Sequence, residues 1–270
     1  MGKPLQFTDI AKSMGLLSMK NKVAVITGST RGIGRAIALS LATQGASVYI
    51  NGRGKTGVEE CVSEFKSKDF DVEGYAGDVS DEKFVKQFVD YVFKKRGHLD
   101  ILINSAGISE VRPLEEISSE AWDKFIGNNL TSVFLMCREA APLMKQQRGG
   151  KIITITSLAA SMGRTGGAHY AASKSGIIGF TKTIAKELGP FNVQVNAIAP
   201  GVVNTEMPRR NSENHQSFFY ALKRGSPLRR ITQPEDIANA ALFLSSPLSD
   251  AITGQILTVD CGSSLNYFGI

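Results

Sequence analysis

A serine, a tyrosine and a lysine stand at spacings that suit acid–base chemistry. Tyr170 comes thirteen residues after Ser157, and Lys174 lies four residues beyond Tyr170. Positions i and i+4 share one face of a helix, so we expect the lysine ammonium beside the phenol oxygen. A phenol titrates at about pH 10, and a neighbouring cation lowers the phenol pKa toward the range of an acid–base catalyst. The serine hydroxyl could orient a substrate carbonyl; an amphipathic surface pair is the alternative reading of the tyrosine and lysine.

A glycine-rich segment is the second chemical candidate. An apolar run over residues 23–27 leads into three glycines with the spacing GxxxGxG and then into a predicted helix. Glycine permits positive φ and a close approach of the backbone to a pyrophosphate, while the helix N-terminus attracts the anion. A turn without a ligand is the alternative. We expect a dinucleotide to contact Gly28, Ser29, Thr30, Arg31, Gly32, Ile33 and Gly34.

The end of the second predicted strand indicates which dinucleotide binds. An acidic residue there would hold the 2′-hydroxyl of NAD, whereas an arginine accommodates the 2′-phosphate of NADP. The chain has Arg53 at this place, with Arg31 as a second cation. The two predict a preference for NADP(H) over NAD(H), unless both are solvated surface arginines. Asp78, followed by Val79, could accept from the adenine amino group or cap the helix after Ser80-Asp81.

These residues need a framework, and the rest of the chain predicts one. Short β-branched runs alternate with longer segments of helical period, which is the pattern of βαβ units. The pattern predicts an α/β fold in a single domain: a Rossmann-type doubly wound parallel sheet of seven strands with helices on both faces. The expected strands are 23–27, 47–51, 72–76, 101–104, 151–156, 193–199 and 256–259, and the expected helices include 33–43, 82–95, 119–146, 170–188 and 234–244.

The domain prediction places a catalytic domain at 21–262, between an N-terminal extension (1–20) and a C-terminal tail (263–270). Within it, residues 204–230 interrupt the strand rhythm and predict an insertion over the carboxyl edge of the sheet, where ligands bind. From 206 to 230 there are six basic and two acidic residues, Arg209 and Arg210 among the basic ones. This charge could steer an anionic substrate, or it could solvate a lid.

Composition limits the other classes of function. The chain has 270 residues, 42% hydrophobic and 21% charged, which is typical of a globular protein. The net charge is only +6 and the chain has no nucleic-acid-binding motif, so we expect no nucleic-acid partner. The three cysteines lack CxxC spacing, which argues against a disulfide frame and a zinc site. The histidines are scattered, which argues against metal binding; they are His98, His169 and His215. With no long apolar run or signal peptide apparent, we expect a cytoplasmic protein without a membrane partner.

Taken together, the motifs resemble the short-chain dehydrogenase/reductase family over residues 21–262. The resemblance implies that Asn129, Ser157, Tyr170 and Lys174 form the catalytic tetrad. Tyr170 would transfer the proton, Lys174 would bind the nicotinamide ribose, and Asn129 would keep a water in a relay behind the lysine. The matching motifs are Thr27-Gly-Ser-Thr-Arg-Gly-Ile-Gly34, Asn104-Ser-Ala-Gly107, Trp122-Asp123, Asn129, Ser157, Tyr170-Ala-Ala-Ser-Lys174, Pro200-Gly-Val-Val-Asn-Thr205 and Asp260-Cys-Gly262.

The same resemblance implies further contacts around the cofactor. Thr205 would contact the nicotinamide carboxamide, and the other residues would border the cofactor or support the central strand. Two positions depart from the family pattern: Ser105 replaces a second asparagine, and Cys261 replaces a glycine. The residues implied are Asn104, Ala106, Gly107, Pro200, Gly201, Val203 and Thr205.

Within the family, residues 129–134 and 252–260 look most like 3-oxoacyl-carrier-protein reductases and their sugar-alcohol relatives. The resemblance implies a homotetrameric, NADPH-dependent carbonyl reductase, reversible as a secondary-alcohol dehydrogenase, acting on a 3-oxoacyl thioester. Leu135 stands where acyl-carrier enzymes often have arginine, so a sugar or polyol dehydrogenase and a small-ketone reductase remain alternatives. An NADP-binding regulatory protein is the non-enzyme alternative, and the intact Ser157, Tyr170 and Lys174 argue against it.

Overall fold

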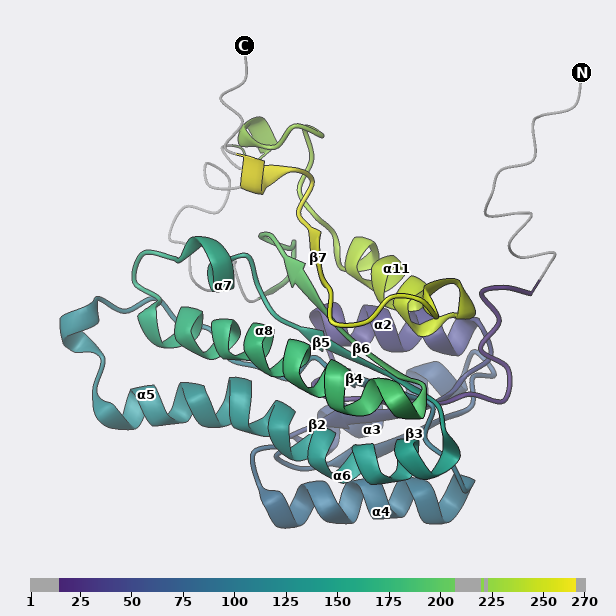
Figure 1. Ribbon diagram of the computed structural model, residues 1–270. Helices are drawn as coiled ribbons and strands as arrows, with labels where there is room; N and C mark the ends of the chain where they lie inside the picture. Colours follow the sequence, from purple (N-terminus) through teal and green to yellow (C-terminus); the bar gives the residue numbers. More distant parts are fainter. Residues whose placement is uncertain (1–14, 207–219, 221–222, 266–270) are drawn as a thin grey trace, which may run out of the picture.

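Strands and helices alternate along the chain in the computed structural model, which describes residues 15–206, 220 and 223–265 (Figure 1). All seven predicted strands are confirmed, with ends that differ by one residue at most. The strands are β1 (Val23–Ile26), β2 (Ser47–Gly52), β3 (Val72–Ala76), β4 (Ile101–Asn104), β5 (Gly150–Ile155), β6 (Val193–Pro200) and β7 (Ile256–Val259). The helices are α2 (Gly32–Thr43), α3 (Lys55–Lys66), α4 (Glu82–Arg96), α5 (Ser119–Ile126), α6 (Ser132–Gln147), α7 (Ala159–Met162), α8 (Ala168–Leu188) and α11 (Pro234–Ser245).

The strands form one sheet in the order β3-β2-β1-β4-β5-β6-β7, and every neighbouring pair is parallel. Parallel neighbours require crossover connections, which the helices provide. The order reverses between β1 and β4, so the connections leave these two strands in opposite directions and open a crevice at their carboxyl ends. The predicted seven-stranded, doubly wound α/β fold in a single domain is confirmed.

Two hydrophobic layers hold the helices on the sheet. Successive side chains of a strand point to opposite faces, so Ala24 and Ile26 of β1 pack in one layer, and Val23 and Val25 pack in the other. Helices α2, α3 and α11 bury their apolar faces in the first layer, whereas α4, α6 and α8 cover the second face (Figure 1). Since both faces of the sheet are covered, its inner strands are deeply buried, and β1, β4 and β6 are buried along their whole length.

Two helical regions differ from the prediction. The segment expected as one helix over 119–146 consists of α5, a π-helical turn at Gly127–Thr131 and α6. The extra residue of a π-helical turn shifts the register of a helix, and such turns are frequent at functional sites. Helix α3 lies outside the helical segments that we predicted, because only Val58, Cys61 and Phe65 of its twelve residues are buried. Such a narrow apolar stripe is a weak signal in the sequence.

The predicted insertion and extension fall mostly outside the described residues. Arg209 and Arg210 lie there, as do His215 and most of the N-terminal extension and C-terminal tail. The two ends of the insertion are described: Val203 pairs with Thr232, and Asn204 N–H donates to Thr232 O at 2.9 Å. The insertion therefore starts and finishes at one place, beside the carboxyl end of β6. Among the helices of the described part, none is long and apolar enough to cross a membrane.

Candidate active site

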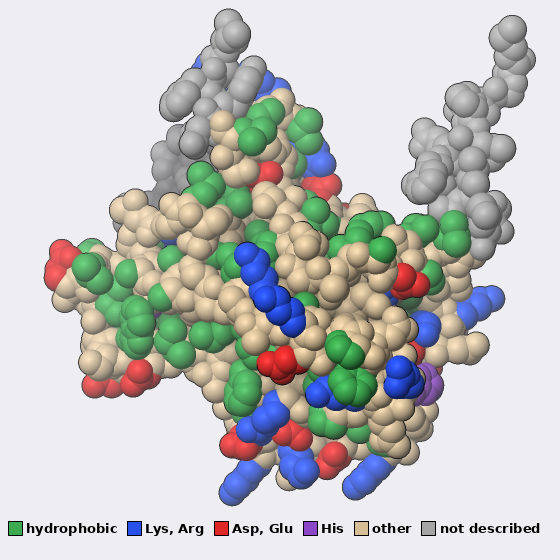
Figure 2. All heavy atoms as spheres, in the orientation of Figure 1, with side chains coloured by type: hydrophobic (Ala, Val, Ile, Leu, Met, Phe, Trp, Pro, Cys, Tyr) green, Lys and Arg blue, Asp and Glu red, His purple; other side chains and the backbone are tan. Residues whose placement is uncertain are grey.

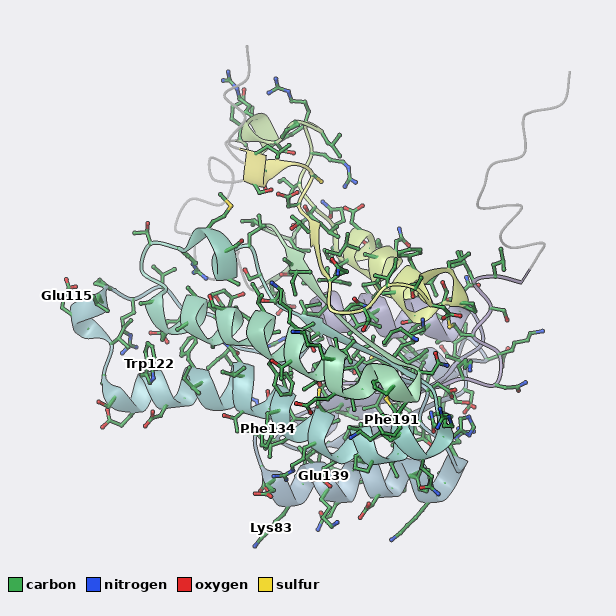
Figure 3. The ribbon with its side chains drawn as sticks, in the orientation of Figure 1. Lys83, Glu115, Trp122, Phe134, Glu139 and Phe191 are labelled. Atoms are coloured by element: carbon green, nitrogen blue, oxygen red, sulfur yellow. The ribbon has the colours of Figure 1, made fainter. Side chains whose placement is uncertain are left out.

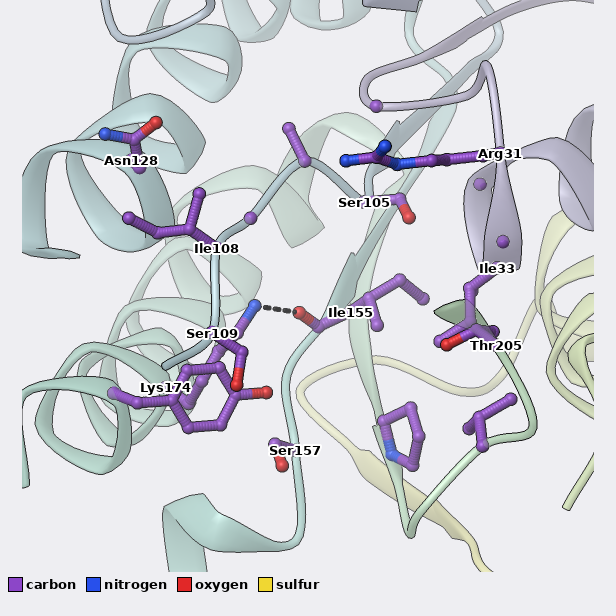
Figure 4. A pocket seen from close by; sticks show the side chains of 18 of the residues that line it. Arg31, Ile33, Ser105, Ile108, Ser109, Asn128, Ile155, Ser157, Lys174 and Thr205 are labelled. Atoms are coloured by element: carbon purple, nitrogen blue, oxygen red, sulfur yellow. Dashed lines mark hydrogen bonds between the residues drawn. The ribbon is translucent and has the colours of Figure 1, made fainter. Parts of the chain in front are cut away.

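A cavity of about 930 Å3 lies at the carboxyl edge of the sheet. Figure 4 shows Arg31, Ile33 and Thr205 on one side of it, and Lys174, Ser157 and Ser109 on the other. The cavity thus joins the glycine segment to the predicted catalytic residues. The predicted residues that line it are Gly28, Thr30, Arg31, Gly32, Ile33, Gly34, Arg53, Asp78, Val79, Ala106, Gly107, Ser157, Tyr170, Lys174, Pro200, Gly201, Val203 and Thr205.

Two predicted cofactor residues, Ser29 and Asn104, lie beneath the cavity instead of lining it. The buried Ser29 hydroxyl donates to Ile26 O at 2.7 Å, which closes the turn after β1. The buried Asn104 amide donates to Thr154 Oγ1 at 3.3 Å and so joins β4 to β5. The Ser29 side chain therefore supports the turn, and its contact with a cofactor stays a prediction. Asn104 keeps the strand-supporting part of its expected role.

The turn after β1 has the geometry of a phosphate-binding loop. Gly28 has φ +61°, and a Cβ atom there would lie 2.7 Å from Ala106 Cα, so only glycine fits without a shift of the backbone. The next helix, α2, begins with neither a side-chain cap at Arg31 nor an acidic residue in its first turn. Its first N–H groups and positive dipole end are available to an anion. These residues fit the pyrophosphate of a dinucleotide.

Asn51, at the end of β2, is a supporting residue that the sequence analysis missed. Its side chain is buried, accepts from Gly28 N–H at 3.4 Å, and donates to Tyr75 O at 3.0 Å and Gly77 O at 3.2 Å. One amide therefore ties the glycine turn to the ends of β2 and β3. An asparagine near the end of a strand gives little signal in the sequence, because its partners lie on other strands.

The two arginines that predict the 2′-phosphate site lie on neighbouring segments. Arg53 directly follows β2 and lines the exposed end of the cavity. Arg31 Nη1 lies 3.8 Å from the carboxylate of Glu206, and both side chains are mainly exposed. Such an exposed pair is weak, typically below about 1 kcal/mol, so a phosphate could displace the carboxylate from Arg31.

Asp78 lines the cavity after β3, and it does not cap α4. Its carboxylate accepts from Ser80 N–H at 2.8 Å and from Ser80 Oγ at 2.7 Å. The cap of α4 is Asp81, whose carboxylate accepts from Lys83 N–H at 2.8 Å. The structure therefore removes the helix-cap alternative for Asp78. Its place in the cavity is consistent with a role near the adenine.

Lys174 and Tyr170 line the same cavity from α8, as their spacing predicts. The lysine is only 5% exposed, and its Nζ donates to Ile155 O at 2.8 Å (Figure 4). Burial disfavours the charged form and lowers the pKa of Lys174 to about 8. The lysine is therefore held by the backbone at the end of β5, close to its titration point at neutral pH.

The phenol of Tyr170 behaves differently from the prediction. Burial raises its pKa above 10, while hydrogen bonding to Ser157 and the positive charge of Arg164 act in the opposite direction. Lys174 is not among the groups that lower it. The net shift of the phenol pKa is thus opposite to the expected one, because burial outweighs the groups that lower it. A raised pKa keeps the phenol protonated at neutral pH.

Asn129 lies in the π-helical turn and does not line the cavity. It is fully buried: its Oδ1 accepts from Ile108 N–H at 2.8 Å, and its Nδ2 donates to Ile108 O at 3.1 Å and Ser173 Oγ at 3.1 Å. A Cβ atom on Gly107 would lie 3.1 Å from Asn129 Oδ1 and 3.5 Å from Lys174 Nζ. The asparagine is therefore close to the lysine and holds the loop after β4.

The two departures from the family motif are both visible. Ser105 lines the cavity, and its backbone N–H donates to Thr27 Oγ1 at 3.1 Å, a bond that any residue can make. Cys261 is buried with φ +57°, a conformation that favours glycine. A left-handed conformation costs an L-residue about 1–2 kcal/mol, so Cys261 is a locally strained position. Neither change removes a group from the reacting end of the cavity.

Three residues near Tyr170 add to the site beyond the prediction. Arg164 and Ser109 line the cavity and are bonded to each other, and the Arg164 guanidinium lies 5.4 Å from the centre of the Tyr170 ring. His169, which directly precedes Tyr170, is completely buried against Phe125. Burial lowers the His169 pKa, so the ring is neutral at pH 7. The only signal for Arg164 was a cation between Ser157 and Tyr170.

The fold and this site together are those of an oxidoreductase that uses a nicotinamide cofactor. Comparison with known proteins identifies the family. A family model described as enoyl-(acyl carrier protein) reductase matches residues 28–264. The chain belongs to the short-chain dehydrogenase/reductase family.

Particular relatives fall within that family. The chain is 38% identical to 3-oxoacyl-[acyl-carrier-protein] reductase FabG of Thermotoga maritima over 91% of this chain and 99% of that protein. It is 37% identical to a 3alpha-hydroxysteroid dehydrogenase of Mediterraneibacter gnavus, over 90% and 97% of the two chains. A gluconate 5-dehydrogenase from Burkholderia cenocepacia, solved with NADP and tartrate, superposes with a TM-score of 0.89 at 31% identity, over 94% and 100%. This chain is accordingly an oxidoreductase that acts on CH–OH or ketone groups.

Proposed function

We propose that this protein is an NADPH-dependent reductase of 3-oxoacyl thioesters, with Tyr170 as the proton donor. One observation carries the proposal: Tyr170, Ser157 and Lys174 line the same cavity as the glycine turn after β1. A dinucleotide whose phosphates bind at the glycine turn extends along the crevice toward these three side chains. The protein contributes orientation and acid–base chemistry, and the nicotinamide supplies the hydride.

Each reacting group has a role that its surroundings support. Reduction adds a hydride to the carbonyl carbon and a proton to its oxygen, and Tyr170 donates that proton. The raised pKa of the phenol keeps the proton in place until the alkoxide forms. Ser157 orients the carbonyl oxygen by a hydrogen bond. Lys174 holds the nicotinamide ribose, and Asn129 supports the proton relay behind it.

Arg31 and Arg53 support the choice of NADPH. Both arginines line the cavity. The residue directly after β2, where an acidic side chain would hold a ribose 2′-hydroxyl, is Arg53. The Burkholderia relative was solved with NADP, which favours the same cofactor here. We therefore expect NADPH to be used in preference to NADH.

The choice of a 3-oxoacyl thioester is supported by the FabG relatives, which are 38–39% identical to this chain and match about 90% of it. The gluconate and hydroxysteroid relatives support two other substrate classes. A panel of acetoacetyl-CoA, 5-ketogluconate and a 3-ketosteroid, each with NADPH and NADH, separates them. We expect the highest kcat/KM for acetoacetyl-CoA with NADPH. A higher kcat/KM for the sugar acid or the steroid would contradict the assignment.

We further propose that the protein is a cytoplasmic homotetramer. Each chain has a catalytic domain at 21–262, an extension at 1–20 and a tail at 263–270, and residues 204–230 act as a substrate lid. Trp122 on α5 and Phe134 on α6 are 40% and 42% exposed, and hydrophobic side chains gather over these helices (Figures 2 and 3). Apolar surface of this kind marks contact sites between proteins. Sedimentation velocity should show a tetramer, and Phe134→Glu should shift it toward smaller species.

A further inference from the structure

Two loops meet above Tyr170 on the substrate side of the cavity. One follows β4, and the other joins β5 to α8. Arg112 N–H in the first loop donates to Gly166 O in the second at 2.7 Å. Gly166 has φ +62°, and a Cβ atom there would lie 2.7 Å from Val111 Cγ1. The close approach of the two loops therefore depends on glycine.

Arg164 reaches from the second loop to the first. Its Nη1 donates to Ser109 Oγ at 2.7 Å, and its Cζ lies 5.4 Å from the centre of the Tyr170 ring. Its aliphatic stem packs on Gly167, where a Cβ atom would lie 3.1 Å from Arg164 Cδ. A hydroxyl, an aromatic ring and a backbone position thus hold the guanidinium beside the proton donor.

The charge of Arg164 is not balanced by a carboxylate of the described chain, whereas the charge of the nearby Arg112 is. Arg112 pairs with Glu110 across 2.6 Å, whereas Arg164 forms no ion pair with any residue that the structure describes. A guanidinium has five N–H donors in a planar fork, and Ser109 accepts from one of them. Since Arg164 lines the cavity, its other donors are available to an oxygen acceptor on a bound molecule.

We propose that Arg164 is a specificity-determining residue that binds the acyl oxygen of the substrate, the second oxygen of a 3-oxoacyl group. This inference rests on the proposed reduction of such a group. The reacting ketone oxygen belongs to Tyr170 and Ser157, and a fixed cation beside them suits the oxygen on the acyl carbon. A neutral thioester carbonyl and the carboxylate of a free 3-oxo acid both offer such an oxygen acceptor. A ketone without an acyl oxygen has nothing for Arg164 to bind.

The test uses three ketones that differ in this oxygen: acetoacetate, its neutral N-acetylcysteamine thioester, and pentan-2-one. Each is reduced with NADPH at pH 7 by the wild type, Arg164→Met and Arg164→Lys. Methionine retains an unbranched stem without the charge. Lys83→Met on α4, at the outer edge of the molecule in Figure 3, is the control for loss of one positive charge.

Arg164→Met should lower kcat/KM about tenfold to a hundredfold for the two acyl substrates, which is the range of one charge-assisted hydrogen bond. It should change kcat/KM for pentan-2-one by less than about threefold, and Arg164→Lys should recover part of the loss for acetoacetate. A larger loss for acetoacetate than for the thioester identifies a free oxo acid, whereas an equal or smaller one identifies a thioester. Losses equal for all three ketones, or no loss, would overturn the proposal.

A binding measurement separates this inference from the proposed reaction. If the wild type reduces none of the three ketones, the proposed function fails, and the wild type and Arg164→Met are then loaded with NADP+ and titrated calorimetrically with acetoacetate. Binding at least about tenfold weaker in Arg164→Met would support Arg164 as the residue that binds the acyl oxygen. Equal affinities, or no binding to either protein, would overturn it.

Discussion

The cofactor end and the substrate end of the cavity are built in different ways. At the cofactor end, the phosphate-binding turn is a continuous stretch whose glycines permit one backbone path, as the close approach of Gly28 to Ala106 shows. At the substrate end, Ser157 and Arg164 come from the segment between β5 and α8, Tyr170 comes from α8, and side chains define the surface. The cofactor end therefore depends on a backbone path that requires glycine at Gly28, whereas a change of one side chain can alter the substrate end.

The largest effect should come from removing the proton donor. We predict that Tyr170→Phe lowers kcat by a factor of at least about 10²–10⁴, because only the transferable proton is lost. The dissociation constant for NADPH, measured by fluorescence titration, should stay near the wild-type value since the cofactor end is untouched. Turnover within about tenfold of the wild type would show that Tyr170 is not the acid, and that the substrate end has been assigned wrongly.

The cofactor end can be tested by its two arginines. Arg53→Ala should reduce the preference for NADPH over NADH by about tenfold to a hundredfold, the worth of one hydrogen bond to a charged group. The preference is measured as the ratio of kcat/KM values for the two cofactors, with Arg31→Ala as the matched variant. An unchanged ratio in both variants would mean that the 2′-phosphate is bound elsewhere.

Lys174 links the two ends, and its replacement should separate stability from activity. Its pKa is about 8 in the folded protein and 10.5 ordinarily, so the unfolded chain binds more protons between these values. Below pH 8 the full cost of burying the lysine is present, and wild-type stability recovers as pH rises toward 10.5. We predict that Lys174→Met loses activity and NADPH affinity, yet without cofactor is more stable at pH 7 by about 1–3 kcal/mol.

Urea unfolding of the wild type and Lys174→Met at pH 7 and pH 9.5 measures this difference. The stability advantage of Lys174→Met should shrink by about 1–2 kcal/mol between the two pH values, because wild-type stability rises over that interval. An advantage that does not change with pH, or a less stable variant at pH 7, would contradict the assignment of a buried, readily deprotonated lysine.

The smallest effect concerns the insertion, whose Arg209 and Arg210 lie outside the described residues. If its charge steers an anionic substrate, kcat/KM for a CoA-linked 3-oxoacyl substrate should fall a few-fold as ionic strength passes about 0.1 M. A neutral ketone should respond less, and Arg209→Ala/Arg210→Ala should remove the difference. Equal salt responses for both substrates would favour a lid without a steering role, and would leave Arg164 as the candidate cation for substrate binding.

Much of the cofactor end was predictable because its signals are local. The glycine spacing, Arg53 and the alternation of strands and helices each occupy a short window of sequence, and the structure places these residues at one edge of the sheet. Asn51 and Arg164 could not be found in this way. Asn51 acts through backbone groups of β1 and β3, and Arg164 acts through Ser109 and Tyr170.

The sequence alone determined the fold class, the strand order along the chain and the residues able to transfer a proton, because periodicity and spacing are properties of neighbouring residues. Only the tertiary structure decided how those residues are used. It buried Lys174 against Ile155 O, which lowers the lysine pKa, and it raised the pKa of Tyr170. It also set Arg164 beside that phenol. These effects depend on burial and on contacts between loops, and both arise when the chain has folded.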